Sequence, residues 1–405
     1  MKPFGRSLSS IPIGEREARG FVARMSLGFT GVFVPLAILL AYLPLWFEHR
    51  GFDAREIGIL LGVPIVARML TTPVLLAAAD RVRDRASLYL AAALLATLCS
   101  VGYLISDGFA VVLLVSVLVS VAMALAIPLS DAIALTGVRR LGLTYGPMRL
   151  WGSLAFIAAT IGGGWVVEHQ GVESIPWLLV GALALTAATG LTLPRIAVAR
   201  RDRAAGPVRD RTLLLGFAAA ALVIGSQATF YGFSSIHWAR IGFSDTVIGL
   251  LWGLGVLAEI VLFAFARPLV RTLSPAGLLL GGAICGIVRW SSFTLDGGVA
   301  FYAFNSLLHA GSFAAAHLGM QQLIAMRVDE DGQGRAQALA FAMSAPVMAA
   351  ATFASGWLYE AFGVDAFLGA AAMCVAALPF ILPIPRTAEV QPQSSRDGGE
   401  TIEPE

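Results

Sequence analysis

The chain is dominated by a succession of apolar runs, and each run is long enough to cross a lipid bilayer as a helix. A transmembrane helix needs about 20 predominantly apolar residues, and runs of this kind recur along all 405 residues. Only 13% of the residues are charged, whereas soluble domains carry roughly 25%. A soluble fold would need a larger core than this chain can enclose. The sequence therefore predicts an all-α polytopic membrane protein.

Short polar breaks divide the apolar runs into twelve expected transmembrane helices, arranged as two six-helix bundles. The helices are expected near residues 25–47, 55–79, 86–106, 109–136, 146–168, 174–194, 212–237, 245–267, 275–295, 298–326, 335–360 and 364–384. The domains that follow are a cytoplasmic N-terminal segment 1–24, a first bundle 25–194, a cytoplasmic linker 195–211, a second bundle 212–385 and a tail 386–405, whose polar composition predicts disorder.

Arginine is distributed unevenly between the loops. The even-numbered loops hold Arg81, Arg83, Arg85, Arg139, Arg140, Arg195, Arg200, Arg201, Arg203, Arg209, Arg211, Arg267, Arg271 and Arg327, whereas the odd-numbered loops are rich in Asp and Glu. Cytoplasmic loops carry an excess of Lys and Arg. We therefore expect both termini in the cytoplasm, in agreement with an even number of helices, and a multi-pass protein of the cell inner membrane.

An internal repeat relates the two halves of the chain. With an offset of 191 residues, Gly51–Arg68 aligns with Gly242–Glu259 and shares Gly, Phe, Ile, Leu and Ala positions. With an offset of 192, Trp165–Val172 aligns with Trp357–Val364 and shares Trp, Glu, Gly and Val. Transporters that work by alternating access are built from such repeats. The repeat predicts a secondary transporter and not an enzyme.

The first alignment ends by placing Arg68 on Glu259, two charges of opposite sign inside apolar runs. A charge in hydrocarbon is costly and marks a functional site by default. Arg68 is predicted to bind an anionic substrate group, because guanidinium matches carboxylate in a bidentate fork. Glu259 is predicted to carry the proton. The alternative is a structural ion pair, although residues equivalent by repeat need not be neighbours in space.

Asp131 and Arg149 are expected at the cytoplasmic ends of two consecutive helices. The antiparallel hairpin between these helices allows the two side chains to meet. Two interpretations stay open, a static ion pair that fixes the hairpin and a cytoplasmic gate that opens and closes during transport.

The tenth expected helix carries three polar side chains, Asn305, His309 and His317. Asn305 and His309 are four residues apart and share one helix face. Such side chains either bond a neighbouring helix or contact the substrate, and we assign Asn305 and His309 to substrate binding and His317 to proton coupling. Arg289, about four residues from the outer end of the ninth helix, is expected to snorkel to the membrane interface.

Aromatic side chains near the expected cavity complete the candidate site. Tyr42 and Trp252 are predicted to stack on a substrate ring, whereas the other Trp residues are expected in packing or at the membrane interface. His237 is expected at the outer surface, where it either lies at the interface or lines an outer vestibule with Gln227 and Tyr231.

Several other kinds of chemistry are excluded by the absence of their motifs. The sequence has no Gly-Lys-Ser/Thr phosphate-binding loop, so ATP cannot drive transport within this chain. It has no zinc motif, and Cys99, Cys285 and Cys374 lie in apolar runs as small hydrophobic residues. The basic residues are scattered, which argues against nucleic-acid binding. We expect no cofactor, with a proton gradient as the energy source.

The loop from Ala79 to Arg85 resembles the corresponding loop of the major facilitator superfamily. Asp80, Arg81 and Arg85 fit the family pattern, and the resemblance implies that Asp80 and Arg81 form ion pairs that lock the loop against the helices. Leu76 stands where the family has glycine, and Arg83 and Asp84 stand where it has a glycine and a basic residue. The family also implies that helix 2 borders helix 11 and helix 5 borders helix 8.

Four further stretches resemble the 3-phenylpropionate permease branch of this superfamily. They are Tyr42–Trp46, Ser130–Ala132 with Tyr145–Ser153, His237–Trp238 with Ile248–Glu259, and Gly334–Ala338. This resemblance implies proton symport of a small aromatic carboxylate by a monomer in the lipid bilayer. Two alternatives stay open: a proton symporter of a neutral nucleoside or sugar, and an exporter of drugs or metabolites by proton antiport.

Overall fold

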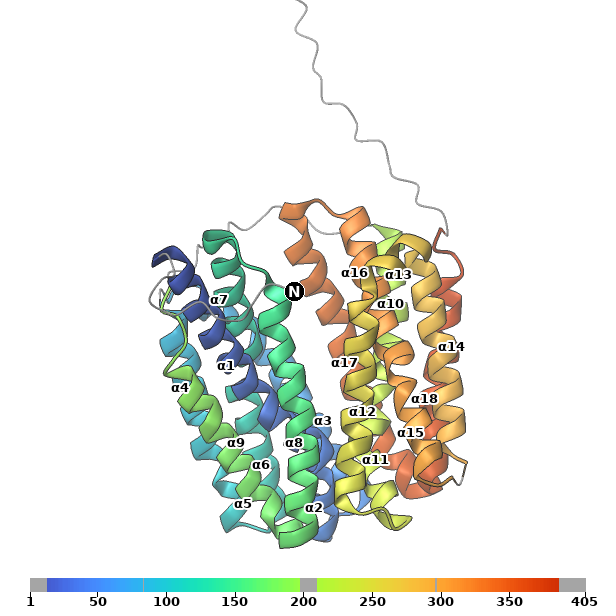
Figure 1. Ribbon diagram of the computed structural model, residues 1–405. Coiled ribbons are helices and arrows are strands. Elements are labelled where there is room, and N and C mark those ends of the chain that lie inside the picture. The colour runs from blue at the N-terminus through green and yellow to red at the C-terminus, as the bar shows by residue number, and fades with distance from the viewer. Residues whose placement is uncertain (1–12, 83, 197–209, 296, 386–405) are drawn as a thin grey trace, which may run out of the picture.

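The computed structural model describes residues 13–82, 84–196, 210–295 and 297–385, which are helical and contain no strand. Two groups of steeply inclined helices stand side by side, one before residue 196 and one after residue 210 (Figure 1). The expected segment 1–24 overlaps the first helix, which begins at Ile13. Residues 1–12, most of the expected linker 195–211 and the tail 386–405 lie outside the described residues.

The first group covers the chain up to Gly190. It contains α1 (Ile13–Ala41), α2 (Leu43–His49), α3 (Ala54–Ala79), α4 (Arg85–Ser100), α5 (Gly102–Ile105), α6 (Phe109–Met123), α7 (Ala126–Leu141), α8 (Tyr145–Gln170), the 3-10 helix η2 (Val172–Ser174) and α9 (Ile175–Gly190).

The second group begins at Arg211. It contains α10 (Arg211–Gly225), α11 (Gln227–Arg240), α12 (Asp245–Ala264), α13 (Ala266–Thr272), α14 (Pro275–Phe293), α15 (Val299–Leu307), the π-helix η3 (Ala310–Ala315), α16 (Ala316–Arg327), α17 (Glu330–Phe362), the 3-10 helix η4 (Gly363–Asp365) and α18 (Ala366–Ile381).

Ten segments of the described chain are long and apolar enough to cross a membrane. One of them, Gly332–Ile381, contains both α17 and α18, and the segment from Val299 to Arg327 is divided by the π-helix η3. Large apolar side chains such as Leu70, Leu98 and Trp177 are exposed, which is the pattern of a surface solvated by lipid. The polytopic helical class is confirmed, whereas the number twelve stays a prediction.

Helices α3 and α12 begin at polar breaks in the sequence, where side chains cap the first helical turn. The Asp53 carboxylate accepts a hydrogen bond from the Glu56 backbone N–H at 2.8 Å, and the Glu56 carboxylate accepts one from the Asp53 N–H at 3.0 Å. This reciprocal arrangement is a capping box and satisfies two N–H groups at the start of α3. Ser244 caps α12 in a similar way through the Val247 N–H.

The two helix groups meet along α3 with α17 and along α8 with α12, as the family resemblance implied. At α3–α17 a Cβ atom added to Gly58 would lie 2.9 Å from Gly356 Cα. At α8–α12 a Cβ atom on Gly249 would collide with the Thr160 carbonyl oxygen. Glycine is therefore required for the backbone approach at both crossings.

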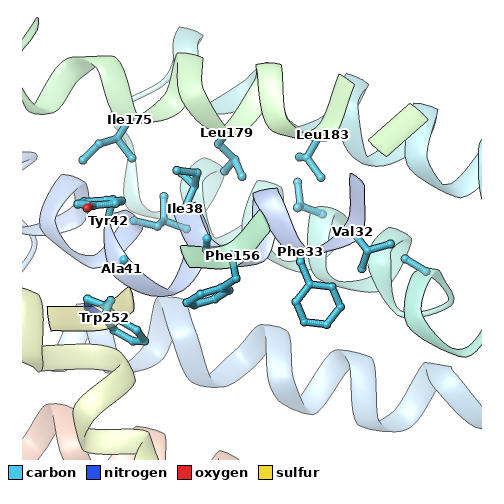
Figure 2. Packing of buried hydrophobic residues seen from close by; sticks show 14 of the residues in the cluster. Val32, Phe33, Ile38, Ala41, Tyr42, Phe156, Ile175, Leu179, Leu183 and Trp252 are labelled. Carbon is cyan, nitrogen blue, oxygen red and sulfur yellow. The ribbon is translucent and has the colours of Figure 1, made fainter. Parts of the chain in front are cut away.

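Both glycine crossings lie near one end of the molecule. We call it the acidic end, because it holds Glu48, Asp107, Glu168, Glu173, Asp245 and Glu360, and the other end, with Arg85, Arg139, Arg140, Arg211, Arg267, Arg271 and Arg327, is the arginine-rich end. Buried apolar side chains of α1, α8 and α9 pack together near the acidic end, with Ile38 between Ile175 and Phe156 and with Ala41 between Tyr42 and Trp252 of α12 (Figure 2).

Candidate functional site

A cavity of about 330 Å³ lies between the two helix groups. It is lined by Phe33, Leu36, Leu40, Arg149, Ser153 and Phe156 of the first group and by Phe230, Tyr231, Leu251, Trp252, Gly255, Val256, Glu259, Phe263, Arg289, Ser306, His309, Phe313 and His317 of the second. Because α12 starts at the acidic end, its lining residues from Leu251 to Phe263 extend from the acidic half of this helix to its arginine-rich end.

Arg289 of α14 is buried at the wall of this cavity, with only 1% of its surface exposed. The two N–H groups of its Nη1 face three acceptors, Gln227 Oε1 at 3.0 Å, His309 Nδ1 at 3.0 Å and Ser312 Oγ at 3.2 Å. The guanidinium carbon also lies 4.5 Å from the ring centroid of Phe230. The prediction that Arg289 snorkels to the interface is wrong, because its partners hold the charge inside the second group.

No carboxylate of the described chain lies within 4.0 Å of the Arg289 guanidinium. The Nε atom is buried and has no hydrogen-bond partner among the described residues. Ser306, which also lines the cavity, has a buried hydroxyl without a partner in the same part of the chain. Buried charges in proteins are normally paired, so this wall of the cavity presents a cation with an unused Nε donor and no carboxylate in direct contact.

Glu259 and Arg289 are connected through His309. The Glu259 carboxylate lies 3.6 Å from His309 Nε2, and the other ring nitrogen, Nδ1, faces Arg289 Nη1. Arginine can only donate a hydrogen bond. We therefore assign Nδ1 as the acceptor, which places the proton of the neutral ring on Nε2, directed at Glu259.

The π-helix η3 extends this arrangement along the cavity wall. His309 precedes η3, and its ring stacks on Phe313 with centroids 5.2 Å apart and an angle of 5°. Phe313 in turn lies parallel to His317 at 6.3 Å and 9°. Side chains four residues apart lie on the same face of a helix, which lets the three rings stand in a row. Such π segments occur frequently at functional sites.

Aromatic side chains form the side of the cavity that faces the acidic end. Trp252 lies parallel to Tyr231 with centroids 6.0 Å apart, and Phe230 and Phe156 contact it at 4.8 and 6.5 Å. The Trp252 indole N–H donates to Ser235 Oγ at 2.9 Å, which fixes the ring. This geometry agrees with the predicted stacking position of Trp252, and its role in binding stays a prediction.

Arg149 of α8 lies on the opposite wall of the cavity. Its guanidinium carbon is 4.0 Å from the ring centroid of Phe33 and 5.7 Å from that of Phe29. Asp131 of α7 accepts a hydrogen bond from the Tyr145 hydroxyl at 2.7 Å. Asp131 and Arg149 form no direct ion pair within 4.0 Å in this conformation. The static pair is therefore not formed, and the gate interpretation stays a prediction.

Three predicted substrate ligands do not line the cavity. Arg68 lies on α3 outside the lining. Tyr42 is fully buried, and its hydroxyl donates to the Thr160 carbonyl at 2.5 Å. Asn305 donates to the Arg289 carbonyl at 2.7 Å, which is the alternative role of bonding a neighbouring helix. His309 and Trp252 do line the cavity, as do the predicted proton-coupling residues Glu259 and His317.

Of the two loop residues expected in ion pairs, Asp80 has a charged partner in its own loop. Asp80 accepts a hydrogen bond from Arg85 at 2.9 Å, and Arg81 is exposed. In the same loop, hydrogen bonds from the Ser87 hydroxyl and N–H hold the pKa of Asp84 below its usual range. Because Asp84 caps α4, the loop chemistry secures the start of this helix.

The residues that sequence reasoning missed belong mostly to the second group. Arg289 was assigned to the interface, and Phe230, Ser306, Ser312 and Phe313 were not singled out. The available signal was the rule that an ionisable residue inside a membrane helix faces the protein interior. Gln227 and Tyr231 were considered only for an outer vestibule, whereas they contact the buried site; His237 instead forms a hydrogen bond with Tyr302 at 2.9 Å.

A membrane fold of two helix groups with a cavity between them that holds buried charged side chains is that of a multi-pass transporter, and comparison with known proteins agrees. The model of the MFS_1 like family matches residues 24–368, so the chain belongs to this family of major facilitator transporters. It is 32% identical over 376 residues to the "Probable 3-phenylpropionic acid transporter" of Escherichia coli (strain K12), covering 89% of this chain and 97% of that protein. It is 28% identical over 326 residues to the "Maltose permease" of Geobacillus stearothermophilus, covering 79% and 82%.

Solved structures confirm the fold. A point mutant of the nucleoside transporter NupG has a TM-score of 0.78 at 16% identity and covers 89% of this chain and 99% of its own. A bacterial homologue of the human lysosomal transporter Spinster, in an inward-facing and unoccupied conformation, has a TM-score of 0.74 at 12% identity, with 90% and 96% covered. At these identities the likeness concerns the fold alone.

Proposed function

We propose that this transporter carries a small aromatic monocarboxylate together with a proton into the cell across the inner membrane. The observation that carries the proposal is the buried Arg289, which faces the cavity without a carboxylate partner among the described residues. A substrate carboxylate would supply the missing anion. A neutral solute would leave the charge uncompensated.

The aromatic wall supports a substrate with a ring. Trp252, Tyr231, Phe230 and Phe156 surround the part of the cavity next to Arg289. Flat rings stack and meet edge to face at the centroid distances found among these side chains. The cavity volume lies at the lower end of the roughly 300–1,000 Å³ range of ligand pockets, so the substrate is small. A phenyl ring with a short acidic side chain satisfies all three conditions, and 3-phenylpropionate, the compound in the name of the Escherichia coli relative, is of this kind.

The Glu259–His309–Arg289 chain supports coupling to protons. With the cavity empty, the Arg289 cation donates to His309 Nδ1 and opposes a second proton on the ring. When a carboxylate binds Arg289, the guanidinium turns its donors to the ligand, and Nδ1 becomes available. The negative charges of the substrate carboxylate and of Glu259 then both favour a second proton on the His309 ring. Substrate and proton thus bind cooperatively, which is the thermodynamic requirement of symport.

The distribution of charge supports the orientation. The arginine-rich end is the cytoplasmic side under the positive-inside rule, and Arg149 and Phe263 line the side of the cavity toward that end. Because the two groups are in contact at the acidic end, the conformation described here is closed toward the outside. The contacts between the two groups are intramolecular, so one chain suffices for transport as a monomer.

The experiment is uptake into proteoliposomes with an imposed pH gradient. Labelled 3-phenylpropionate should accumulate when the outside is acidic, and a protonophore should abolish this accumulation. Unlabelled cinnamate should compete, whereas the neutral isostere 3-phenylpropanol, maltose and a nucleoside should not. Accumulation of labelled maltose or nucleoside, or equal competition by 3-phenylpropanol, would contradict the assignment of a carboxylate substrate.

A further inference from the structure

The acidic end contains two hydrogen bonds that join the helix groups in opposite directions. Glu168, near the end of α8 in the first group, accepts from the Thr246 backbone N–H of α12 in the second group at 3.0 Å. Glu360, near the end of α17 in the second group, accepts from the Ala54 N–H of α3 in the first group at 3.2 Å. Each carboxylate thus binds the N-terminus of a helix that belongs to the other group.

These two contacts are equivalent under the internal repeat. Glu168 aligns with Glu360 at an offset of 192, and Ala54 aligns with Asp245, the residue next to Thr246, at an offset of 191. The N–H groups of a first helical turn have no partner within their own helix, and the helix dipole favours a negative charge there. Either carboxylate therefore satisfies an N–H group that would otherwise need water.

The glycine crossings beneath the carboxylates follow the same symmetry. A Cβ atom added to Gly356 would lie 2.6 Å from the Ala54 carbonyl oxygen, and one added to Gly164 would collide with the Asp245 carbonyl oxygen. These two glycines precede Glu360 and Glu168 by one helical turn. The close backbone approach brings each carboxylate to the end of the opposing helix, so the hydrogen bonds form only while the two groups are in contact.

We propose that Glu168 and Glu360 are a pair of latches that hold the acidic end closed, and that both must release when the transporter opens toward this end. The contacts depend on an approach of the two helix groups that opening abolishes. Neither carboxylate forms an ion pair within 4.0 Å in the described chain. The hydrogen bond of each carboxylate therefore stabilises the closed state, and removal of the carboxylate shifts the conformational equilibrium toward the open state.

The test measures the conformation directly and requires no substrate. Spin labels are attached at Gln170 and Asp365, which are exposed at the acidic end on different groups, after the three native cysteines have been replaced. Electron–electron distance measurement in nanodiscs then gives the ratio of long to short distances. Loss of one helix-terminal cap corresponds to about a fivefold change in such an equilibrium. Glu168→Ala and Glu360→Ala should each raise the long-distance ratio by about this factor.

The double variant should raise the ratio by about 25-fold, because the latches share no partner and their effects add. The matched control is Glu173→Ala, since the partners of this carboxylate at the same end are His49, Arg50 and Trp46 of its own group. The control should leave the ratio unchanged. Unchanged distances in both single variants, or an equal change in the control, would overturn the proposal.

A conservative variant keeps the test independent of folding. Glu168→Gln retains an oxygen that can accept the Thr246 N–H and loses only the charge, so its ratio should lie between those of the wild type and Glu168→Ala. A ratio for Glu168→Gln equal to that of Glu173→Ala, together with wild-type behaviour of Glu360→Ala, would likewise overturn the latch role. Failure of 3-phenylpropionate uptake would refute the proposed substrate and leave these distances unaffected.

Discussion

Replacing Arg289 with glutamine should weaken substrate binding strongly while it changes the stability of the unliganded protein little. The variant loses a buried charge, the hydrogen bonds from Nη1 and the contact with the Phe230 ring. Hydrogen bonds to a charged group contribute about 1.5–3 kcal/mol each, and a desolvated cation–π contact about 2 kcal/mol. Burying an ion costs several kcal/mol. These opposing contributions are of similar size, so the unliganded variant should match the wild type within about 2 kcal/mol.

Substrate binding should respond much more strongly. Two charge-assisted hydrogen bonds from guanidinium to carboxylate correspond to about 3–6 kcal/mol, or a 10²–10⁴-fold increase in Kd. A ligand present at 100 times its Kd stabilises the folded state by about 2.7 kcal/mol. At the same concentration the variant should gain about 0.4 kcal/mol or less, because its Kd has risen to at least the ligand concentration.

Thermal unfolding in detergent, followed by tryptophan fluorescence with and without 3-phenylpropionate, measures both quantities. The control is Arg68→Gln, which removes an intramembrane arginine that does not line the cavity and should keep the full ligand-induced shift. A full shift in Arg289→Gln would refute the reasoning. A lost shift in Arg68→Gln would instead support the carboxylate-binding role predicted from the sequence repeat.

Three further substitutions test the remaining parts of the site. Glu259→Gln should abolish accumulation driven by a pH gradient and keep exchange of internal for external substrate, because glutamine cannot carry the proton; pH-driven uptake at the wild-type level would contradict this. Trp252→Ala should raise the KM for 3-phenylpropionate by about 5–10-fold, the effect of losing one aromatic contact of about 1–1.5 kcal/mol, and an unchanged KM would remove Trp252 from the binding site. Tyr42→Phe should increase exposure of the acidic end by up to about fivefold in the spin-label measurement, because the hydroxyl that reaches the Asp245 carbonyl of the second group is lost, and an unchanged distance ratio would exclude this bond from closure.

The fold could be predicted from the sequence because the bilayer restricts the choice so strongly. Apolar runs of fixed length can only be helices in hydrocarbon, and the repeat around Gly51–Arg68 and Gly242–Glu259 indicates how the halves correspond. Individual side-chain contacts could be predicted less well from the sequence. The resemblance implied ion pairs for Asp80 and Arg81 without giving their partners, and the structure shows that Asp80 bonds Arg85.

The candidate site could be predicted only in part, because depth along a helix does not give the direction of a side chain. Arg68 and Glu259 lie at equal depth and are equivalent by repeat, yet only Glu259 lines the cavity. Arg289 was placed at the interface because it is close to a helix end in sequence. Its true environment is created by Gln227, His309 and Ser312 from other helices, and no property of its own segment contains that information.

The contacts that join the two groups at the acidic end follow the internal repeat with one exception. Glu168 and Glu360 make equivalent contacts, and so do the glycines next to them, because closing one end of the molecule requires the two groups to touch at matched places. Tyr42 departs from this symmetry, since its repeat partner is Phe233, which has no hydroxyl and stacks on Tyr359 instead. The Tyr42 hydroxyl bonds the Thr160 carbonyl within its own group and also lies 3.4 Å from the Asp245 carbonyl oxygen of α12, a contact between the groups beside the α8–α12 crossing that Phe233 cannot form. With both latches released, the α3–α17 crossing should separate first, and the movement should be centred on α8 and α12, the pair whose α12 member carries Glu259 and Trp252. Opening would then disturb the proton site and the aromatic wall least, so that the substrate stays bound to Arg289 while access to the cavity changes.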